Sequence, residues 1–225
     1  MLLGQAVMIN WSDVAAENRP AYYEWHNREH MPGAVALNGF HRGRRFLAAH
    51  AKRDFLMLYE IADISVLVGL EYMTKVENPS PLTRRTTPYI KNSIRGLTRV
   101  KCSLGYAIGG YALTLRFDPR DGGEDELGNY LTHEALRRIA ERADIVGAHL
   151  CVTDKPVSSV VTTERRGRPT IVPNWIVILE GVSLEAVDNA CDAELAEETL
   201  HQHGCAGTIE RDTYSLQIVC PKYAA

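Results

Sequence analysis

Two stretches of similar sequence, 57-MLYEIADISVL-67 and 176-IVILEGVSLEAV-187, are the strongest indication of the fold of this chain. Each is an apolar run that ends in a glutamate and leads into a helix start, so Glu60 and Glu180 occupy matching positions. In FLMLYEI, residues 55–61, apolar side chains stand on both alternations of the strand. A strand of this kind is covered on both faces of its sheet. The two stretches therefore predict two copies of one unit whose sheets cover each other.

The same order of elements, β-α-β-β-α-β, is expected in each half of the chain. In the first half, strands are expected at 3–11, 39–48, 54–62 and 94–104, and helices at 16–31 and 63–76. In the second half, strands are expected at 106–117, 146–154, 174–182 and 208–220, and helices at 125–143 and 183–203. This is the order of the ferredoxin-like unit, an antiparallel sheet with both helices on one face. The predicted fold class is α+β: two ferredoxin-like repeats, 1–105 and 106–225, packed sheet to sheet as an intrachain α+β barrel.

Proline and glycine mark the expected interruptions of this pattern. Pro32 disfavours helix geometry at Met31, so the first helix should end near His30. Gly69 is a weak point in the second helix, and the prolines that follow predict a loop or broken turn. The polar segment 155–169, between two strands of the second half, is expected to be a long mobile loop.

The composition is that of an ordinary globular protein, because 45% of the 225 residues are hydrophobic and 24% are charged. No apolar run reaches the ~18 residues of a membrane span, so no membrane is expected as a partner. The N-terminal stretch is predicted to be a strand and not a signal peptide. Five cysteines, an odd number without a CxxC pair, indicate reduced thiols and a cytoplasmic location.

Charge divides unevenly between the halves. Residues 1–105 hold 14 Lys and Arg against 9 Asp and Glu, whereas residues 106–225 hold 11 against 19. The basic residues are dispersed, so nucleic acid is not an expected partner. A basic first half favours an anionic or polarised small ligand there, although a solvated surface explains any single pair of arginines as well.

The stretch 23-YEWHNREHMP-32 contains H-x-x-E-H, the pattern of one class of zinc peptidase. His26 and His30 stand four residues apart, so both rings emerge on one face of a helix. A catalytic zinc also needs a third protein ligand, and nothing further along the sequence singles one out. We therefore expect no metal and interpret the stretch as the end of a pocket-lining helix.

The segment 22-YYEWHNREHMP-32, followed by 38-NGFHRGRRF-46, resembles the first helix and second strand of EthD-like proteins. It is also similar to other dimeric α+β-barrel families, including the stress-responsive A/B barrel proteins. The resemblance covers about residues 5–105 and is topological over 106–225. Such relatives usually form the barrel from two chains, so the resemblance implies that this chain holds both halves.

By this resemblance His30 matches the histidine of the family's His-x-Pro-type turn. The corresponding helix of the second half contains His133 but no such turn, so a single pocket is expected, in the first half. Members of the superfamily bind small, often aromatic molecules between the sheet and the helices. Some are isomerases, dehydratases or cofactor-free monooxygenases and others bind haem, so the fold alone does not choose among these activities.

The candidate site combines a proton-transfer group with flat apolar surface and hydrogen-bond donors. A histidine can accept and return a proton at neutral pH, so His30 is the candidate acid/base, assisted by His26. Arg42 and Arg44 share one face of their strand and Arg45 points to the other, and one of these sets is expected to stabilise an enolate or carboxylate. The candidate substrate-binding residues are Tyr22, Trp25, Asn27, Arg44, Arg45 and Tyr59.

Each of these residues also has a structural interpretation. Tyr22 and Trp25 at helical spacing are typical of core packing. His30, close to a helix C-terminus, is also placed to interact with the helix dipole. The clustering of two histidines with aromatic residues on one helix is what favours a site.

Three functions follow from this interpretation. The first is a cofactor-independent enzyme, of the isomerase, dehydratase/lyase or monooxygenase type, that acts on a carbonyl or aromatic substrate. The second is a non-catalytic binding or accessory protein of a degradation or stress pathway. The third is a haem-binding protein with His26 or His30 as axial ligand. The expected partner is a small aromatic or anionic molecule, and the chain is either a monomeric pseudo-dimer or a homodimer.

Overall fold

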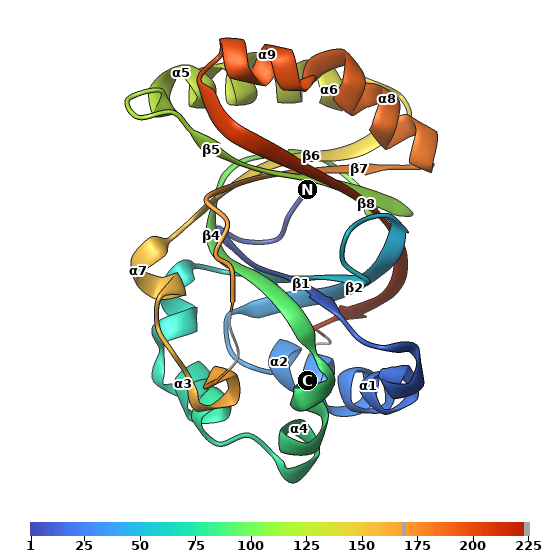
Figure 1. The fold of residues 1–225 in the computed structure, drawn as a ribbon, viewed down its shortest axis with the longest axis vertical. Coiled ribbons are helices and arrows are strands. Elements are labelled where there is room, and N and C mark those ends of the chain that lie inside the picture. Colours follow the sequence, from blue (N-terminus) through green and yellow to red (C-terminus); the bar gives the residue numbers. More distant parts are fainter. Residues whose placement is uncertain (168–169, 223–225) are drawn as a thin grey trace.

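The computed structural model describes residues 1–167 and 170–222, which fold into one closed barrel (Figure 1). The eight strands are β1 (Ala6–Asp13), β2 (Phe40–His50), β3 (Phe55–Ile61), β4 (Lys91–Gly105), β5 (Tyr111–Pro119), β6 (Ile145–Thr153), β7 (Trp175–Gly181) and β8 (Cys205–Pro221). The helices of the first half are α1 (Arg19–Trp25), α2 (Met31–Val35), α3 (Leu70–Glu77) and α4 (Pro81–Thr86). Those of the second half are α5 (Glu124–Asn129), α6 (Leu136–Ala140), α7 (Lys155–Ser158), α8 (Leu184–Glu194) and α9 (Glu197–Gln202).

The barrel consists of two four-stranded sheets joined at their edges. The order around it is β1-β3-β2-β8-β5-β7-β6-β4, and each half contributes one ferredoxin-like sheet. The two seams are the antiparallel pairs β2–β8 and β4–β6. The predicted intrachain α+β barrel is therefore confirmed, and the strand edges of each half are satisfied by the other half.

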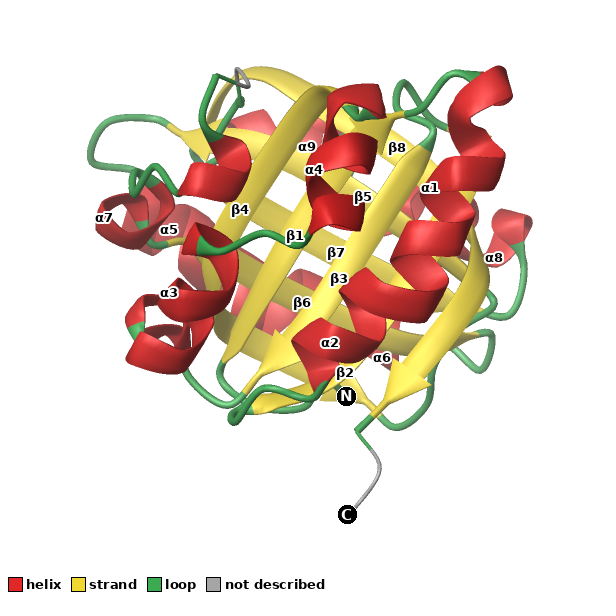
Figure 2. Ribbon diagram, turned by 90° about the horizontal axis from the view of Figure 1, so that it is seen from below, coloured by secondary structure: helices red, strands yellow, loops and turns green. Residues whose placement is uncertain are grey.

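The helices lie outside the barrel, in two groups (Figures 1 and 2). Helices α1 to α4 cover the first sheet, and α5, α6, α8 and α9 cover the second. Each sheet thus has one face toward its own helices and one face toward the barrel interior. In β3, Leu56 and Leu58 belong to the interior core, whereas Met57 and Tyr59 pack with the first-half helices. This is why both alternations of the strand are apolar.

A buried polar cluster crosses the barrel interior and joins the two halves. Arg44 stands opposite Leu58 in the β2–β3 pair, and His149 stands opposite Ile178 in the β6–β7 pair. Arg44 and His149 therefore occupy matching positions. Glu60 and Glu180, two residues beyond these partners, point into the same interior.

Arg44 bridges the glutamates of the two halves. Its Nε lies 3.0 Å from Glu60 Oε1, and its Nη1 donates to Glu180 Oε2 at 2.5 Å. Arg42 donates to both oxygens of Glu60, at 2.9 and 2.7 Å. Burial lowers the pKa of His149, so this ring is neutral at pH 7. The two arginines and two glutamates then balance in charge, as a buried cluster requires.

Two π-helical turns, His26–His30 and Tyr130–Ala135, lie in the first long helix of each half. The prediction that the first helix ends near His30 was wrong, because it continues through Pro32 to Val35 as α2. The Met31 N–H donates to the carbonyl of His26, five residues back. This wider turn accommodates a proline that lacks an N–H and would crowd the backbone of an ordinary α-helix.

Three other elements differ in detail from the expectation. The second helix breaks at Gly69, where a 3₁₀ turn over Ile64–Val68 gives way to α3. Pro81 starts the short helix α4, capped by Ser80, within the segment expected to be a loop. The segment expected to be mobile contains α7 and a 3₁₀ turn (Thr163–Arg165) that pack against the first half, whereas positions 168 and 169 lie outside the described residues.

The interior cluster predicts a large cost for Glu180→Gln. Burial alone would raise the pKa of Glu180, but the charge of Arg44 and the hydrogen bonds from His149 and Arg44 hold it well below its ordinary value of 4.5. Removing this charge leaves Arg44 underpaired, so the free energy of unfolding at pH 7 should fall by about 3–5 kcal/mol.

Urea unfolding measures this loss, with Glu141→Gln on the exposed surface as the matched control. A carboxylate with a depressed folded pKa stabilises fully above the unfolded pKa and less as pH falls below it. The difference between wild type and Glu180→Gln should therefore shrink below pH 4.5. Equal stability of Glu180→Gln and Glu141→Gln would show that the cluster does not hold the halves together.

Candidate functional site

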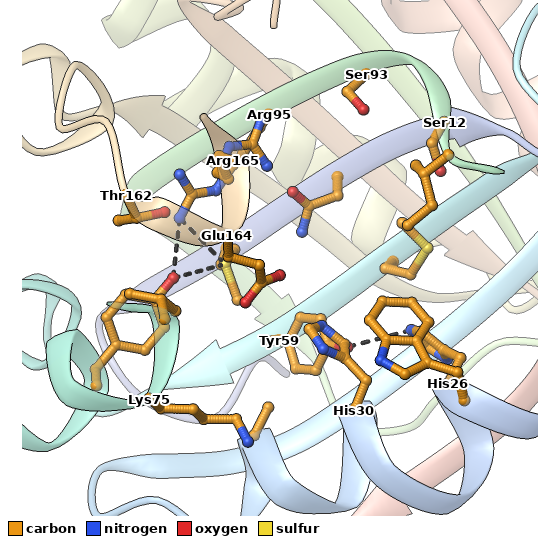
Figure 3. Close-up of a pocket in the computed structure, with 18 of the residues that line it drawn as sticks. Ser12, His26, His30, Tyr59, Lys75, Ser93, Arg95, Thr162, Glu164 and Arg165 are labelled. Carbon is orange, nitrogen blue, oxygen red and sulfur yellow. Dashed lines mark hydrogen bonds between the residues drawn. The ribbon is translucent and has the colours of Figure 1, made fainter. Parts of the chain in front are cut away.

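A cavity lies between the outer face of the first sheet and the first-half helices (Figure 3). It measures about 810 Å³, including the part open to solvent. Strands β1, β3 and β4 contribute Met8, Asn10, Ser12, Met57, Tyr59, Ser93 and Arg95, and the helices contribute Tyr22, Trp25, His26, His30, Tyr72 and Lys75. Mostly apolar walls with a few polar groups are typical of a small-molecule site.

The aromatic wall of the cavity is fixed by hydrogen bonds to its neighbours. Trp25 Nε1 donates to Thr83 Oγ1 at 2.9 Å, and Tyr22 Oη donates to Met57 Sδ at 3.2 Å. Glu29 accepts from the hydroxyls of Ser80 and Thr83, at 2.5 and 2.9 Å. The glutamate of H-x-x-E-H therefore ties the helix to α4.

His26 is buried and held from both sides. Arg45 Nη1 lies 3.0 Å from Nδ1, and Tyr59 Oη lies 3.3 Å from Nε2. A guanidinium can only donate, so Nδ1 accepts and the proton of the neutral ring is on Nε2, facing Tyr59. Burial, with the charges of His30 and Arg45, lowers the pKa of His26 well below 6.5, so the ring is neutral at pH 7.

Tyr59 presents a protonated hydroxyl to the cavity. Burial raises its pKa well above 10, and the charges of Tyr22 and Glu164 act in the same direction. Because Nε2–H of His26 donates toward Tyr59 Oη, the phenol proton is directed to another acceptor. Tyr59 can therefore donate a hydrogen bond to an oxygen of a bound molecule.

His30 lies on the cavity side of the same helix. Its ring centroid is 4.3 Å from that of Trp25, 5.7 Å from that of His26 and 6.3 Å from that of Tyr59. Figure 3 shows His30 next to Tyr59 at the cavity surface. A ligand that contacts both residues would have a hydrogen-bond donor on one side and an imidazole on the other.

Three other predicted site residues do not line the cavity. Asn27 and Arg45 lie behind His26, where Arg45 Nη1 also donates to Asn27 Oδ1 at 2.6 Å. Arg45 therefore orients His26 and does not contact the cavity. Arg44 points to the other face of the sheet, into the barrel interior. Strand alternation separates Arg44 from Arg45, but the sequence does not show which face carries the cavity.

Several cavity residues were not predicted from the sequence. Arg95 on β4 and Tyr72 and Lys75 on α3 line it, together with Thr162, Glu164 and Arg165 from the second half. The segment that carries the last three docks on the first half, where Thr163 hydrogen-bonds Glu77 through its N–H and hydroxyl. The sequence gives one indication of this segment's role, namely its length. The connection between β6 and β7 is much longer than the equivalent connection between β2 and β3, which is residues 51–54.

The corresponding place in the second half is filled. Counting back from the starts of α6 and α2, Leu131 and Ala135 match His26 and His30. Both are fully buried in the core between the second sheet and its helices. His133, the histidine of that helix, is exposed.

The described residues offer few ligands for a metal ion or a haem. Among residues 1–167 and 170–222, no group of three or more His, Cys, Asp or Glu is placed to hold a metal ion. A haem needs an axial ligand from the protein. His26 does not fit that role, because both of its nitrogens face other side chains. The ring of His30 packs against that of Trp25. Among the described residues, the cavity lining contains no histidine besides His26 and His30 that could serve as axial ligand.

No protein-family model and no curated protein matches this sequence. Solved structures match it over most of its length. An anthrone oxidase-like protein has a TM-score of 0.66 and 13% identity, with 96% of this chain and 92% of that chain covered. A provisionally named monooxygenase of Fusobacterium nucleatum has a TM-score of 0.65 and 9% identity, with 98% and 96% covered. A haem-binding protein of Thermus thermophilus has a TM-score of 0.55 and 10% identity, with 95% and 91% covered.

These similarities show the fold. The chain folds as an α+β barrel, with both halves of the barrel in one polypeptide. At such low identity the function of a neighbour does not transfer with the fold. In the described part of the chain, none of the helices has the length and apolarity needed to cross a bilayer.

The environment of His26 predicts that its ring stays neutral as pH is lowered through 6.5. Two-dimensional ¹H–¹⁵N NMR of the imidazoles measures this, and His26→Gln assigns the signal. The shifts should also identify Nε2 as the protonated nitrogen. A histidine peptide in the same sample gives the ordinary titration. A midpoint for His26 at or above 6.5, or a proton on Nδ1, would contradict the arrangement.

Proposed function

We propose that this protein is a cofactor-independent enzyme that takes a proton from a flat aromatic or carbonyl substrate bound in the first-half cavity. His30 accepts the proton, and Tyr59 donates a hydrogen bond to the oxygen on which negative charge develops. Trp25 and Tyr22 provide the surface against which the substrate packs. Arg45 positions the pair by fixing the tautomer of His26.

The observation that carries this proposal is the donor chain from Arg45 through His26 to Tyr59. A donor that is aimed at a developing oxyanion in a site shielded from water stabilises the transition state without rearrangement. A positioned base contributes about 10²–10⁴-fold. The base, His30, and the hydrogen-bond donor, Tyr59, lie at one end of the cavity, where a substrate can contact both.

The names of structural neighbours favour oxygen as the next reactant. One is anthrone oxidase-like, and two are provisionally named monooxygenases. In anthrone a proton leaves the acidic CH₂ group and the resulting anion reacts with O₂, which gives the quinone carbonyl and one water. The chain's own contribution is to remove that proton and to bind the anion.

The pairing of both barrel seams within one chain supports a monomer as the working unit. The edge strands of each half are already paired with those of the other half. Sedimentation equilibrium should give a mass near 25.1 kDa. A stable dimer would show that another surface mediates assembly.

Oxygen uptake with anthrone as substrate tests the proposed reaction. His30→Gln should lower kcat/KM by at least about 100-fold, because it removes the base. Tyr59→Phe should lower it by about 10²–10³-fold, because it removes the oxyanion donor. His133→Gln is the matched control from the second half, and its rate should equal that of wild type.

The other outcomes separate the alternatives. Unchanged turnover in His30→Gln would refute its role as base. Quenching of tryptophan fluorescence by anthrone without oxygen uptake would indicate a binding or accessory protein. A Soret band on addition of haemin that His30→Gln abolishes would indicate a haem-binding protein.

A further inference from the structure

Arg95 is a buried cation that faces the cavity with few partners. Its side chain is 6% exposed. Nη2 donates to Tyr72 Oη at 3.0 Å and lies 3.7 Å from Met8 Sδ. Among the residues that the structure describes, no carboxylate lies within 4.0 Å of its guanidinium. A hydroxyl and a thioether do not compensate a full positive charge.

The other buried arginines are satisfied in a different way. Arg44 is paired with glutamates of both halves, and Arg116 with Asp212. Arg45 has no carboxylate, but its guanidinium donates to three neutral acceptors and stacks on Tyr23. An unpaired buried charge lowers the stability of a protein by several kcal/mol. The environment of Arg95 therefore favours the binding of an anionic ligand.

The charges around Arg95 also favour an anion. Lys75 and Arg165 line the same cavity, and Glu164 is the one carboxylate among the described lining residues. Figure 3 shows Arg95 and Arg165 together on the side of the cavity away from His30. A cavity with an excess of one sign of charge and low-dielectric walls concentrates ligands of the opposite sign.

Strand order sets the distance between this group and the proposed catalytic pair. Arg95 is on β4 and Tyr59 is on β3, with β1 between them. Arg95 is level with Met57, two residues along the strand from Tyr59. With neighbouring strands about 4.8 Å apart and a rise of about 3.3 Å per residue, the Cα positions of Arg95 and Tyr59 are separated by about 12 Å. A fused two-ring aromatic acid can span that distance.

We infer that Arg95 anchors an anion subsite and that the ligand of this cavity is a flat aromatic molecule with a carboxylate at one end. Arg95 holds the carboxylate, and the opposite end of the ligand reaches Tyr59 and His30. The inference rests on the proposed function for the location of the reacting end. The binding of the carboxylate does not depend on whether a reaction follows.

Calorimetric titration with 2-naphthoate and its neutral analogue 2-naphthamide tests the subsite. Wild type should bind the carboxylate at least 10-fold more tightly than the amide, because charge-assisted hydrogen bonds to a guanidinium are the stronger ones. Arg95→Met should lose this preference, and Arg95→Lys should retain part of it. Lys101→Gln, an exposed change on the same strand, should keep it in full.

Thermal unfolding provides a second readout. If Arg95 has a structural role, Arg95→Met should lower the melting temperature like any change that breaks a buried pair. If its charge awaits a ligand, Arg95→Met should be as stable as wild type or more stable without ligand, because an unpaired charge is replaced by an apolar chain. Naphthoate should then raise the melting temperature of wild type and of Lys101→Gln, but not that of Arg95→Met.

Equal affinity of wild type for naphthoate and naphthamide would overturn the subsite, as would the absence of naphthoate binding at millimolar concentration. Retention of the preference by Arg95→Met would place the anion elsewhere. These results are independent of turnover. If His30→Gln loses activity but wild type binds the two probes equally, the proposed reaction stands and the anion subsite is refuted. If His30→Gln keeps its activity but wild type prefers naphthoate, the anion subsite stands and the proposed reaction is refuted.

Discussion

The ion pairs of Arg44 with Glu60 and Glu180 join the two halves inside the barrel. A charge inside the barrel is tolerated only when it is paired, and this one is paired once to each half. The barrel must therefore close with the two sheets in a fixed relation. Its seams then pair β2 with β8 and β4 with β6. With the interior filled in this way, the space available to a ligand lies on the outer face of the sheet, under the helices.

The two halves share a topology but differ at the site. The π turn of the first half directs His26 and His30 toward the cavity, whereas Leu131 and Ala135 fill the matching place in the second half. The second half contributes in another way, through the segment after β6 that brings Glu164 and Arg165 to the cavity. A barrel formed within one chain allows this division, because each half can change without altering its counterpart.

Much of the fold was predictable from the sequence. Apolar residues on both alternations of 55–61 and the match of Glu60 with Glu180 were enough to predict two sheets that cover each other. The aromatic and histidine cluster on the first helix was predictable because local spacing determines which residues share a helix face. The prediction failed where long-range geometry decides: Arg44 was assigned to ligand binding and lies inside the barrel.

The missed residues have the same cause. Arg95 is one of several arginines that lie on strands. The sequence does not show which face of each strand borders the cavity, and the folded barrel does. The extension of the helix through Pro32 depends on a π turn, which hydrophobic periodicity does not show. The docking of the segment 155–167 on the first half depends on contacts between residues far apart in the sequence, such as Thr163 with Glu77.

Removal of a proton from a bound substrate, without a cofactor, is the step that we assign to the first-half cavity. The most direct measurement is exchange of the acidic CH₂ protons of anthrone for deuterium, followed by NMR in deuterated buffer without oxygen. Wild type should accelerate this exchange, and His30→Gln should not. Exchange at the rate of buffer alone in the presence of wild type, or equal acceleration by wild type and His30→Gln, would contradict it.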